Sequence, residues 1–269
     1  MGTVVTIDVY GGDGRRDDEE DEALARARAI LHEADEMFST WKDESSVSRL
    51  RRGEITLEEA PAPVAEVLAL CRTAREVSHG WFDPWAMPGG VDPTGLVKGW
   101  AAQRALEALA SEGMSGALVN AAGDIAGFGG PGGAAPFRIG IVDPSSPGRL
   151  ACVVELAGAI ATSGTYERGA HLFDPHTRRP ATRLASASVT GPDLGLADAL
   201  ATALAVAGDD ALEIVAALEG YEALAIGFDA AWRWTAQFPF APPTPPPPRA
   251  ASVGAAAPWG YVHVSPAQP

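Results

Sequence analysis

ATSGTYERGAHLFDPHTRRP, residues 161–180, is the stretch around which the rest of the chain can be interpreted. The apolar run at residues 151–160 before it predicts a strand. Residues 172–173 begin a short second strand that Pro175 ends. The glycine-broken turn between them carries His171 among hydroxyl and arginine side chains. Such a turn is either a solvated hairpin loop or part of a binding site, and this stretch alone leaves both interpretations open.

The chain has 269 residues, 46% of them hydrophobic, which is enough to bury a sizeable core in one large domain or two closely associated ones. The formal net charge is −15, so no basic footprint for nucleic acid is present and a nucleic-acid partner is not expected. An anionic ligand would need a metal ion or a few well-placed cations. No apolar run reaches transmembrane length, and no signal peptide or lipobox is visible. The sequence therefore predicts a cytoplasmic protein without a transmembrane segment.

Hydrophobic periodicity predicts strands and helices along the chain. Strands are expected at 3–9, on both sides of a turn at 122–124 within 117–129, and at 137–142, 151–160, 185–189, 221–228 and 231–235. Helices are expected at about 21–38, 64–77, 100–109, 195–207 and 209–218, with Gly208 as a C-cap. From residue 240 the composition becomes Pro- and Ala-rich. This predicts a globular domain over 1–239 and a low-complexity tail over 240–269, in which 259–264 is either a docked end or unstructured.

Three patterns exclude common site types. Residues 127–132 satisfy GxGxxG, but no helix follows, so they are not a dinucleotide fingerprint. No GxxxxGK[ST] sequence occurs, which excludes a P-loop. Cys71 and Cys152 are interpreted as free buried thiols rather than as a disulfide framework.

A second informative stretch, residues 79–109, collects aromatic and charged side chains ahead of a predicted helix. It contains Trp81, Phe82, Asp83, Trp85, Asp92, Gly95 and Lys98. Aromatic rings beside glycine turns at a helix start form a natural cradle for a flat ring and a phosphate. Lys98 by itself is weak evidence, because surface lysines are common. Trp41, at the exit of the first helix, could equally fill the core.

The predicted helix at 195–207 is almost wholly apolar, yet it carries Asp198 and Thr202 four residues apart and hence on one face. A carboxylate and a hydroxyl are hard oxygen ligands of the kind that Mg²⁺ prefers. The alternative is an exposed Asp198 and a Thr202 that bonds its own helix. Buried polar groups need partners, and a metal ion would supply one.

Several ordered motifs together resemble the FAD:protein FMN transferases, the ApbE family. They are MGT at 1–3, FSTW and SSVSRL within 38–50, FDP at 82–84, VDPTGLVKGWA at 91–101, VNAAGDI at 119–125, ATSGTYER at 161–168, HLFDPHTRRP at 171–180 and ADALATAL at 197–204. The resemblance runs from residue 1 to about residue 235. Each motif is weak by itself, whereas the ordered set is highly specific.

The resemblance implies a Mg²⁺-dependent enzyme that cleaves FAD, joins FMN by a phosphoester to a threonine of an acceptor flavoprotein, and releases AMP. It also implies an α+β fold of two interleaved subdomains with mixed sheets and flanking helices, similar to the T-fold-like arrangement of that family. Two alternatives stay open: an FAD pyrophosphatase that gives FMN and AMP, and a non-catalytic FAD-binding protein.

The resemblance also implies roles for individual residues. Asp198, Thr202 and the carbonyl of Gly95 would hold the metal, with Asp198 also counted as catalytic. His171 would assist proton removal from the acceptor hydroxyl, as a general base. The flavin nucleotide would be contacted by Asp92 and Lys98, in a pocket lined by Met1, Trp41, Trp81, Phe82 and Asp83, with Phe173 nearby.

The sequence departs from the family pattern at several positions. Thr165 replaces an acidic residue, residues 176–178 replace a basic-Thr-Gly run, and Ala122 replaces the first of two glycines. The segment between Asp83 and Asp92 is much shorter than in many members of the family. These changes leave the metal-binding residues intact and bear on adenine and acceptor recognition.

Overall fold

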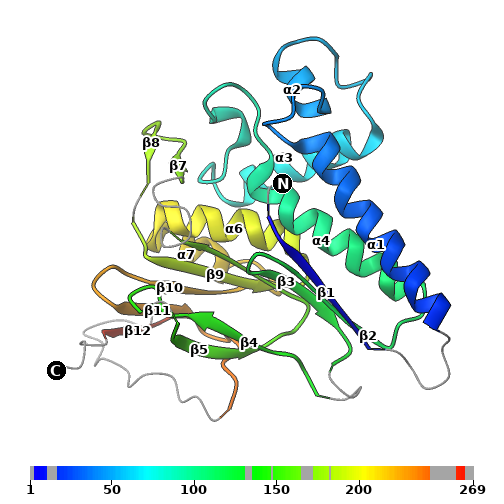
Figure 1. Ribbon diagram of the computed structural model, residues 1–269. Coiled ribbons are helices and arrows are strands. Elements are labelled where there is room, and N and C mark those ends of the chain that lie inside the picture. The colour runs from blue at the N-terminus through cyan, green and yellow to red at the C-terminus, as the bar shows by residue number, and fades with distance from the viewer. Residues whose placement is uncertain are drawn as a thin grey trace.

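An eight-stranded antiparallel sheet forms the centre of the computed structural model, which describes residues 3–10, 17–130, 135–146, 148–164, 172–181, 183–242 and 259–263. The strand order is β1-β2-β3-β6-β9-β10-β11-β12 (Figure 1). The strands of this sheet are β1 Val5–Tyr10, β2 Gly116–Ala121, β3 Asp124–Phe128, β6 Ala159–Gly164, β9 Ser186–Gly191, β10 Glu222–Ile226, β11 Ala231–Thr235 and β12 Trp259–His263. Two small sheets accompany it: β4 Arg138–Val142 with β5 Leu150–Glu155, and β7 Phe173–Asp174 with β8 Arg179–Pro180.

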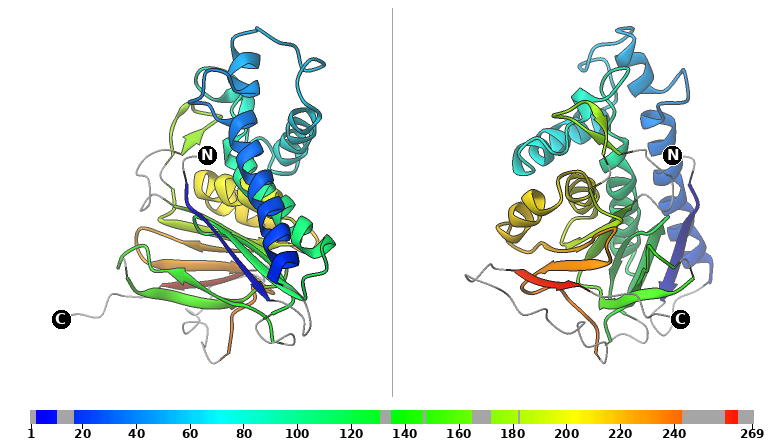
Figure 2. Two further views of the ribbon diagram at one scale, coloured as in Figure 1. Left: turned by 45° about the vertical axis from the view of Figure 1, so that its right-hand side comes forward. Right: turned by 90° about the vertical axis from the view of Figure 1, so that its left-hand side faces the viewer.

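Helices cover one face of the large sheet, and β4–β5 lies on the other face (Figures 1 and 2). The helices are α1 Asp17–Phe38, α2 Ser46–Arg51, α3 Ala62–Val77, the 3-10 turn η1 Pro84–Ala86, α4 Thr94–Ser111, α6 Leu194–Ala207 and α7 Asp209–Ala216. One core fills the space between the sheet and these helices, and a second core lies among α1, α3, α4 and α6. A third core lies between the sheet and β4–β5. None of the helices in the described part of the chain combines the length and apolarity needed to span a bilayer.

The predicted α+β class is confirmed, but the expectation of mixed sheets needs correction. All pairings among the described strands are antiparallel. The helical segments are inserted between antiparallel neighbours: α1–α4 between β1 and β2, and α6–α7 between β9 and β10. Each insertion therefore leaves and rejoins the sheet at the same end. A parallel pair would need a crossover to the opposite end.

Two predicted element boundaries were wrong. The single strand expected at 151–160 is two strands, β5 and β6, because Gly158 adopts a positive φ of 92° and turns the chain between them. The helix expected from residue 100 begins at Thr94. Asp92 Oδ1 accepts hydrogen bonds from the backbone N–H and the hydroxyl of Thr94, at 3.0 and 2.6 Å, and so fixes this early start. Gly95 and Lys98 consequently lie inside α4.

Part of the Pro- and Ala-rich segment contributes to the sheet. Residues 259–263 form β12, which pairs with β11, with Thr235 opposite Trp259. Ala241 also donates its N–H to the carbonyl of Val153 at 2.8 Å, next to β5. The division of the chain at residues 239 and 240 stays a prediction.

Candidate active site

A cavity of about 410 Å³ opens beside α4 and α6 and is bordered by the loops before α2 and α4. Its lining includes Trp41, Trp81, Phe82, Asp83, Asp92, Gly95, Lys98, Phe173, Asp198 and Thr202. These are all the sequence-predicted site residues within the described part of the chain. Met1 and His171 lie outside the described residues. The fold thus collects side chains from five separate stretches of sequence into one cavity, while their individual roles stay predictions.

The crossing of α4 and α6 builds the floor of the cavity. A Cβ at Gly99 would collide with the carbonyl oxygen of Leu194 and would lie 3.1 Å from Asp198 Cβ, so only glycine permits this approach. Gly99 N donates to Asp198 Oδ2 at 3.3 Å. One turn before Gly99 in α4, a Cβ at Gly95 would lie 3.7 Å from Thr202 Oγ1 on α6. The three predicted metal-binding residues therefore lie together where the two helices cross.

Asp198 and Thr202 point toward the interior of the site. Asp198 is 4% exposed, which rules out the alternative of a solvated helix residue. The Thr202 hydroxyl lies 3.3 Å from Ser163 Oγ on β6. Ser163, in the 161–180 stretch, therefore meets Thr202 at the cavity. The turn at residues 165–171 lies outside the described residues, so its interpretation as a binding site stays a prediction.

Asp124 is a component of the site to which the sequence analysis gave no role. It begins β3, has no exposed surface, and its Oδ2 lies 2.5 Å from Lys98 Nζ. Its Oδ1 accepts the N–H of Thr162 at 3.2 Å. Its carboxyl group lies close enough to that of Asp198 for each to influence the pKa of the other. Asp124 lies in the VNAAGDI motif, which was the only signal in the sequence that could have indicated it.

The electrostatics of these two carboxyl groups follow from their burial. Burial raises the pKa of Asp198 well above its usual value, and the neighbouring Asp124 charge raises it further. Burial likewise raises the pKa of Asp124, although the Lys98 ammonium opposes the rise. Two adjacent buried carboxylates with one lysine favour either a shared proton or a bound cation.

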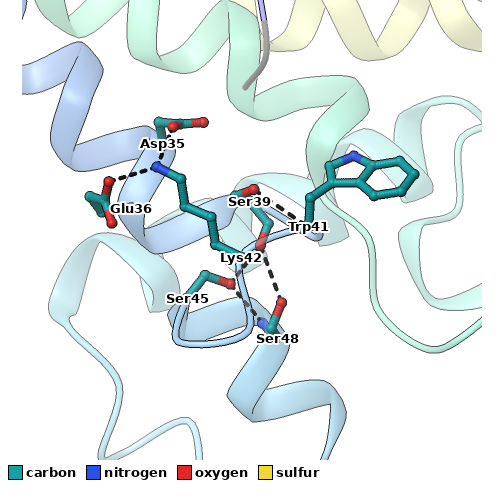
Figure 3. Close-up of polar contacts among 7 residues, drawn as sticks. All are labelled: Asp35, Glu36, Ser39, Trp41, Lys42, Ser45 and Ser48. Carbon is teal, nitrogen blue, oxygen red and sulfur yellow. Dashed lines mark hydrogen bonds and ion pairs between the residues drawn. The ribbon is translucent and has the colours of Figure 1, made fainter.

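The FSTW motif begins a tight turn after the end of α1, and Trp41 projects from this turn (Figure 3). Ser45 Oγ donates to the carbonyl of Ser39 at 2.5 Å and accepts the N–H of Ser48 at 3.0 Å. Lys42 Nζ lies 2.6 Å from both Asp35 Oδ2 and Glu36 Oε1. Trp41 is 93% exposed, so the interpretation that it fills the core is wrong. Trp41 still lines the cavity, and its ring points away from the polar turn that holds its backbone (Figure 3).

Trp81 and Asp83 form another part of the cavity wall. The Trp81 ring packs edge-on against His176, with ring centroids 4.3 Å apart, and the Arg183 guanidinium lies 5.2 Å from its centroid. Asp83 Oδ1 accepts the N–H of Trp85 at 2.9 Å, and its Oδ2 lies 2.8 Å from Arg75 Nε. Both oxygens of Asp83 thus hold the loop.

Asp174 stabilises the β7–β8 turn. It is 6% exposed, and its Oδ1 accepts the N–H groups of His176 and Thr177 at 2.8 and 3.2 Å. Burial acts to raise the pKa of Asp174, but the hydrogen bonds from Thr177 and His176 hold it below its usual value. A carboxylate in this state is a poor proton acceptor at neutral pH.

Comparison with known proteins shows the family to which this chain belongs. The model of the ApbE family matches residues 1–89 and 86–225. The chain belongs to the ApbE family.

Two relatives illustrate the range of similarity within the ApbE family. The FAD:protein FMN transferase of Klebsiella pneumoniae (strain 342) is 25% identical over 287 aligned residues, covering 82% of this chain and 80% of the relative. The enzyme of the same name from Rhodobacter capsulatus is 36% identical over 143 residues, or 50% of this chain, but this chain spans only 27% of that relative.

Solved structures of ApbE proteins share the fold. The flavin transferase ApbE from Vibrio cholerae aligns with a TM-score of 0.75 at 21% identity, covering 87% of this chain and 93% of that one. The ApbE protein from Thermotoga maritima aligns with a TM-score of 0.73 at 22% identity, covering 86% and 93%. At these identities the likeness establishes the fold alone.

Proposed function

We propose that the chain is a flavin transferase that cleaves FAD, attaches FMN by a phosphoester to a threonine of an acceptor flavoprotein, and releases AMP. The observation that carries the proposal is the single cavity in which the α4–α6 crossing brings Asp198, Thr202 and Gly95 beside an aromatic wall. Aromatic side chains suit a flat isoalloxazine ring. The curated relatives bear the name of this activity.

Mg²⁺ is the metal ion in this proposal, held by the Asp198 carboxylate, the Thr202 hydroxyl and the Gly95 carbonyl. The residues fit it, because the buried carboxyl groups of Asp124 and Asp198 lie close together and Lys98 pairs with Asp124, so a bound cation would offset the cost of ionising both. The described residues contain no cluster of three acidic, histidine or cysteine ligands. Mg²⁺ commonly uses one or two carboxylates and takes its other ligands from water and phosphate. When bound, it would neutralise charge on the pyrophosphate.

The chain's own residues would bind and orient the two substrates. The threonine hydroxyl oxygen forms a bond to the phosphorus of the FMN half, the bond from that phosphorus to the bridging oxygen breaks, and AMP leaves with the electron pair. His171 takes the hydroxyl proton in this proposal. Lys98 and the aromatic wall orient the nucleotide, which makes positioning the main task of the cavity.

Two other outcomes are distinguished by experiment. If water replaces the threonine, the chain is an FAD pyrophosphatase. If neither reaction occurs, it is a non-catalytic FAD-binding protein. The buried Asp124–Asp198 pair argues against simple binding, since burying two carboxyl groups is costly unless they serve a charge-dependent task.

The decisive experiment is to express the chain together with flavoproteins encoded near it and to search them by mass spectrometry for FMN on threonine. The expected result is covalent FMN that requires Asp198. AMP release from FAD without any modified protein would support the pyrophosphatase instead. FAD binding without AMP release would support the carrier. A cytoplasmic location remains a prediction.

A further inference from the structure

The loop between η1 and α4, residues 87–92, forms one edge of the candidate active-site cavity. Met87 at its start and Asp92 at its end both line the cavity. Residues 88–90 between them are exposed, and two of the three are glycines, which have no side chain to pack against a core. Glycine also allows wide backbone freedom, so this loop needs a partner elsewhere in the chain to fix its conformation.

Arg51, the last residue of α2, supplies that partner. Its Nε donates a hydrogen bond to the carbonyl oxygen of Gly89 at 2.8 Å, and its Nη2 donates to that of Pro88 at 3.0 Å. Of the described residues, Arg51 alone donates to these two carbonyl groups, and it forms no ion pair with any of them. The planar guanidinium therefore holds two adjacent peptide groups in one orientation.

The backbone of the loop matches the guanidinium. Gly89 and Gly90 have positive φ angles of 82° and 105°. A Cβ on Gly89 would collide with Nη2 of Arg51, and a Cβ on Gly90 would lie 3.5 Å from its Cγ. Alanine at position 89 would therefore displace the guanidinium as well as strain the backbone.

The helix that carries Arg51 is itself fixed. Val47 and Ser48 are buried, and Ser48 Oγ donates to the carbonyl of Ser39 at 3.2 Å (Figure 3). Leu50 packs against the core among α1, α3, α4 and α6. Arg51 thus extends from a rigid element to a loop that has few contacts of its own.

We propose that Arg51 is a positioning residue for FAD, which holds Met87 in the cavity wall through the carbonyl groups of Pro88 and Gly89. This inference rests on the proposed flavin transferase function. A methionine thioether makes favourable contacts with aromatic rings, and FAD carries one at each end. Fixing the loop before FAD binds removes an entropy cost from the binding step. A wall contact stabilises FAD equally before and during the reaction, so it acts on affinity and not on the chemical step.

The test compares Arg51→Ala with Arg49→Ala in the full chain. Arg49 lies on the same helix, with its Nε 3.9 Å from Glu54 Oε2, and it donates to neither loop carbonyl. FAD titration followed by tryptophan fluorescence should show binding about tenfold weaker in Arg51→Ala and unchanged in Arg49→Ala. Arg51→Lys should lie between them, because an ammonium lacks the planar fork that reaches both carbonyls. With Mg²⁺, the KM for FAD should rise in Arg51→Ala while AMP release at saturating FAD keeps its rate.

Gly89→Ala tests the same contact from the loop, and FAD binding should weaken as in Arg51→Ala. Gly53→Ala is its matched control, because Gly53 also has a positive φ, of 69°, but a Cβ there meets nothing within 4 Å. Amide hydrogen exchange without ligand should be faster across residues 87–92 in Arg51→Ala and Gly89→Ala, and unchanged there in the two control variants.

Equal FAD affinity of Arg51→Ala and Arg49→Ala would overturn the proposal, as would unchanged exchange across residues 87–92. Slower AMP release at saturating FAD with an unchanged KM would also overturn it, because Arg51 would then act on the chemical step. Faster exchange throughout Arg51→Ala would show a general role in stability and would count against it too. FAD affinity and exchange are measured without turnover, whereas absent AMP release by the unmodified chain would contradict the transferase function separately.

Discussion

Lys98 Nζ lies 2.5 Å from Oδ2 of Asp124, a carboxylate with no exposed surface. The sequence predicted Lys98 as a cation directed at the nucleotide, but the fold also makes it the counter-ion of a buried acid. One lysine then faces two carboxyl groups, Asp124 and Asp198. In the proposed reaction Lys98 would therefore need help from an additional cation to neutralise the pyrophosphate, and Mg²⁺ is the cation proposed.

Replacing Lys98 should therefore affect stability and FAD binding together. Lys98→Met leaves Asp124 buried without a counter-ion, and breaking a buried pair in this way costs about 3–5 kcal/mol. FAD affinity should fall about tenfold or more through loss of a charge-assisted contact. Urea unfolding and FAD titration measure the two effects.

The double variant Lys98→Met/Asp124→Asn separates these roles. Removing the Asp124 charge should restore most of the lost stability without restoring FAD affinity. Recovery of both would show that Lys98 acts on the nucleotide only by keeping the fold intact.

Asp198→Ala tests the metal site. The variant should fold normally. Its raised pKa shows that the Asp198 carboxylate is costly to bury beside Asp124, so removing it also removes that cost. Mg²⁺ stabilises only a state that binds it, so Mg²⁺ should raise the Tm of the wild type but not of the variant. AMP release from FAD should fall about 10²-fold or more, since a Lewis acid contributes several kcal/mol.

The matched control for this prediction is Asp193→Asn at the start of the same helix. Asp193 Oδ1 caps α6 by accepting the N–H of Leu196 at 2.7 Å and does not line the cavity. This variant should keep its Mg²⁺ response. An Mg²⁺-induced Tm shift of undiminished size in Asp198→Ala would remove Asp198 from the metal site.

His171→Ala tests the general base. Transfer of FMN should fall about 10²-fold or more, while FAD binding persists. His176→Ala is the comparison. Its ring packs on Trp81, which lines the cavity, so this variant should alter affinity and leave the rate constant of the chemical step unchanged. Single-turnover mass spectrometry of an acceptor protein separates the two effects.

Full transfer by His171→Ala would remove histidine from the mechanism. Asp174 is not a suitable replacement, because hydrogen bonds keep its pKa low and hold its Oδ1 in the β7–β8 turn. Another group near the cavity would then have to accept the proton.

The two cysteines give a prediction for alkaline pH. Burial raises the pKa of the Cys71 and Cys152 thiols from 9.0 to about 12. The folded state thus holds these protons more tightly than the unfolded state, and the associated stability is fully present below pH 9. It declines as pH rises from about 9 toward 12.

Thiol labelling checks this directly. Iodoacetamide at pH 8.5 should modify neither thiol in the folded chain and both in urea, because only an accessible thiolate reacts. Rapid labelling of Cys71 in the folded protein would contradict its burial between α3 and the neighbouring helices.

The sequence by itself determined the elements that rest on local chemistry and on ordered motifs. The period of α6, its cap at Gly208 and the i, i+4 spacing of Asp198 and Thr202 all follow from neighbouring residues, and the structure agrees with them. The motif set also indicated the family, because many ordered matches are hard to obtain by chance. The predicted ligand-binding residues came from that resemblance, and all the described ones line one cavity.

Only the tertiary structure decided the relationships between distant segments. The proximity of Asp124 and Asp198 depends on β3 and α6 being brought together, and the bare backbone of Gly99 permits the close crossing of α4 and α6 beside them. The antiparallel pairing, the exposed position of Trp41 and the contact of Arg51 with the loop at residues 87–92 are equally non-local. Local periodicity specifies which face of an element is apolar but does not specify its partner. Long-range packing therefore decides which charged groups face one another in the site and where its cavity opens.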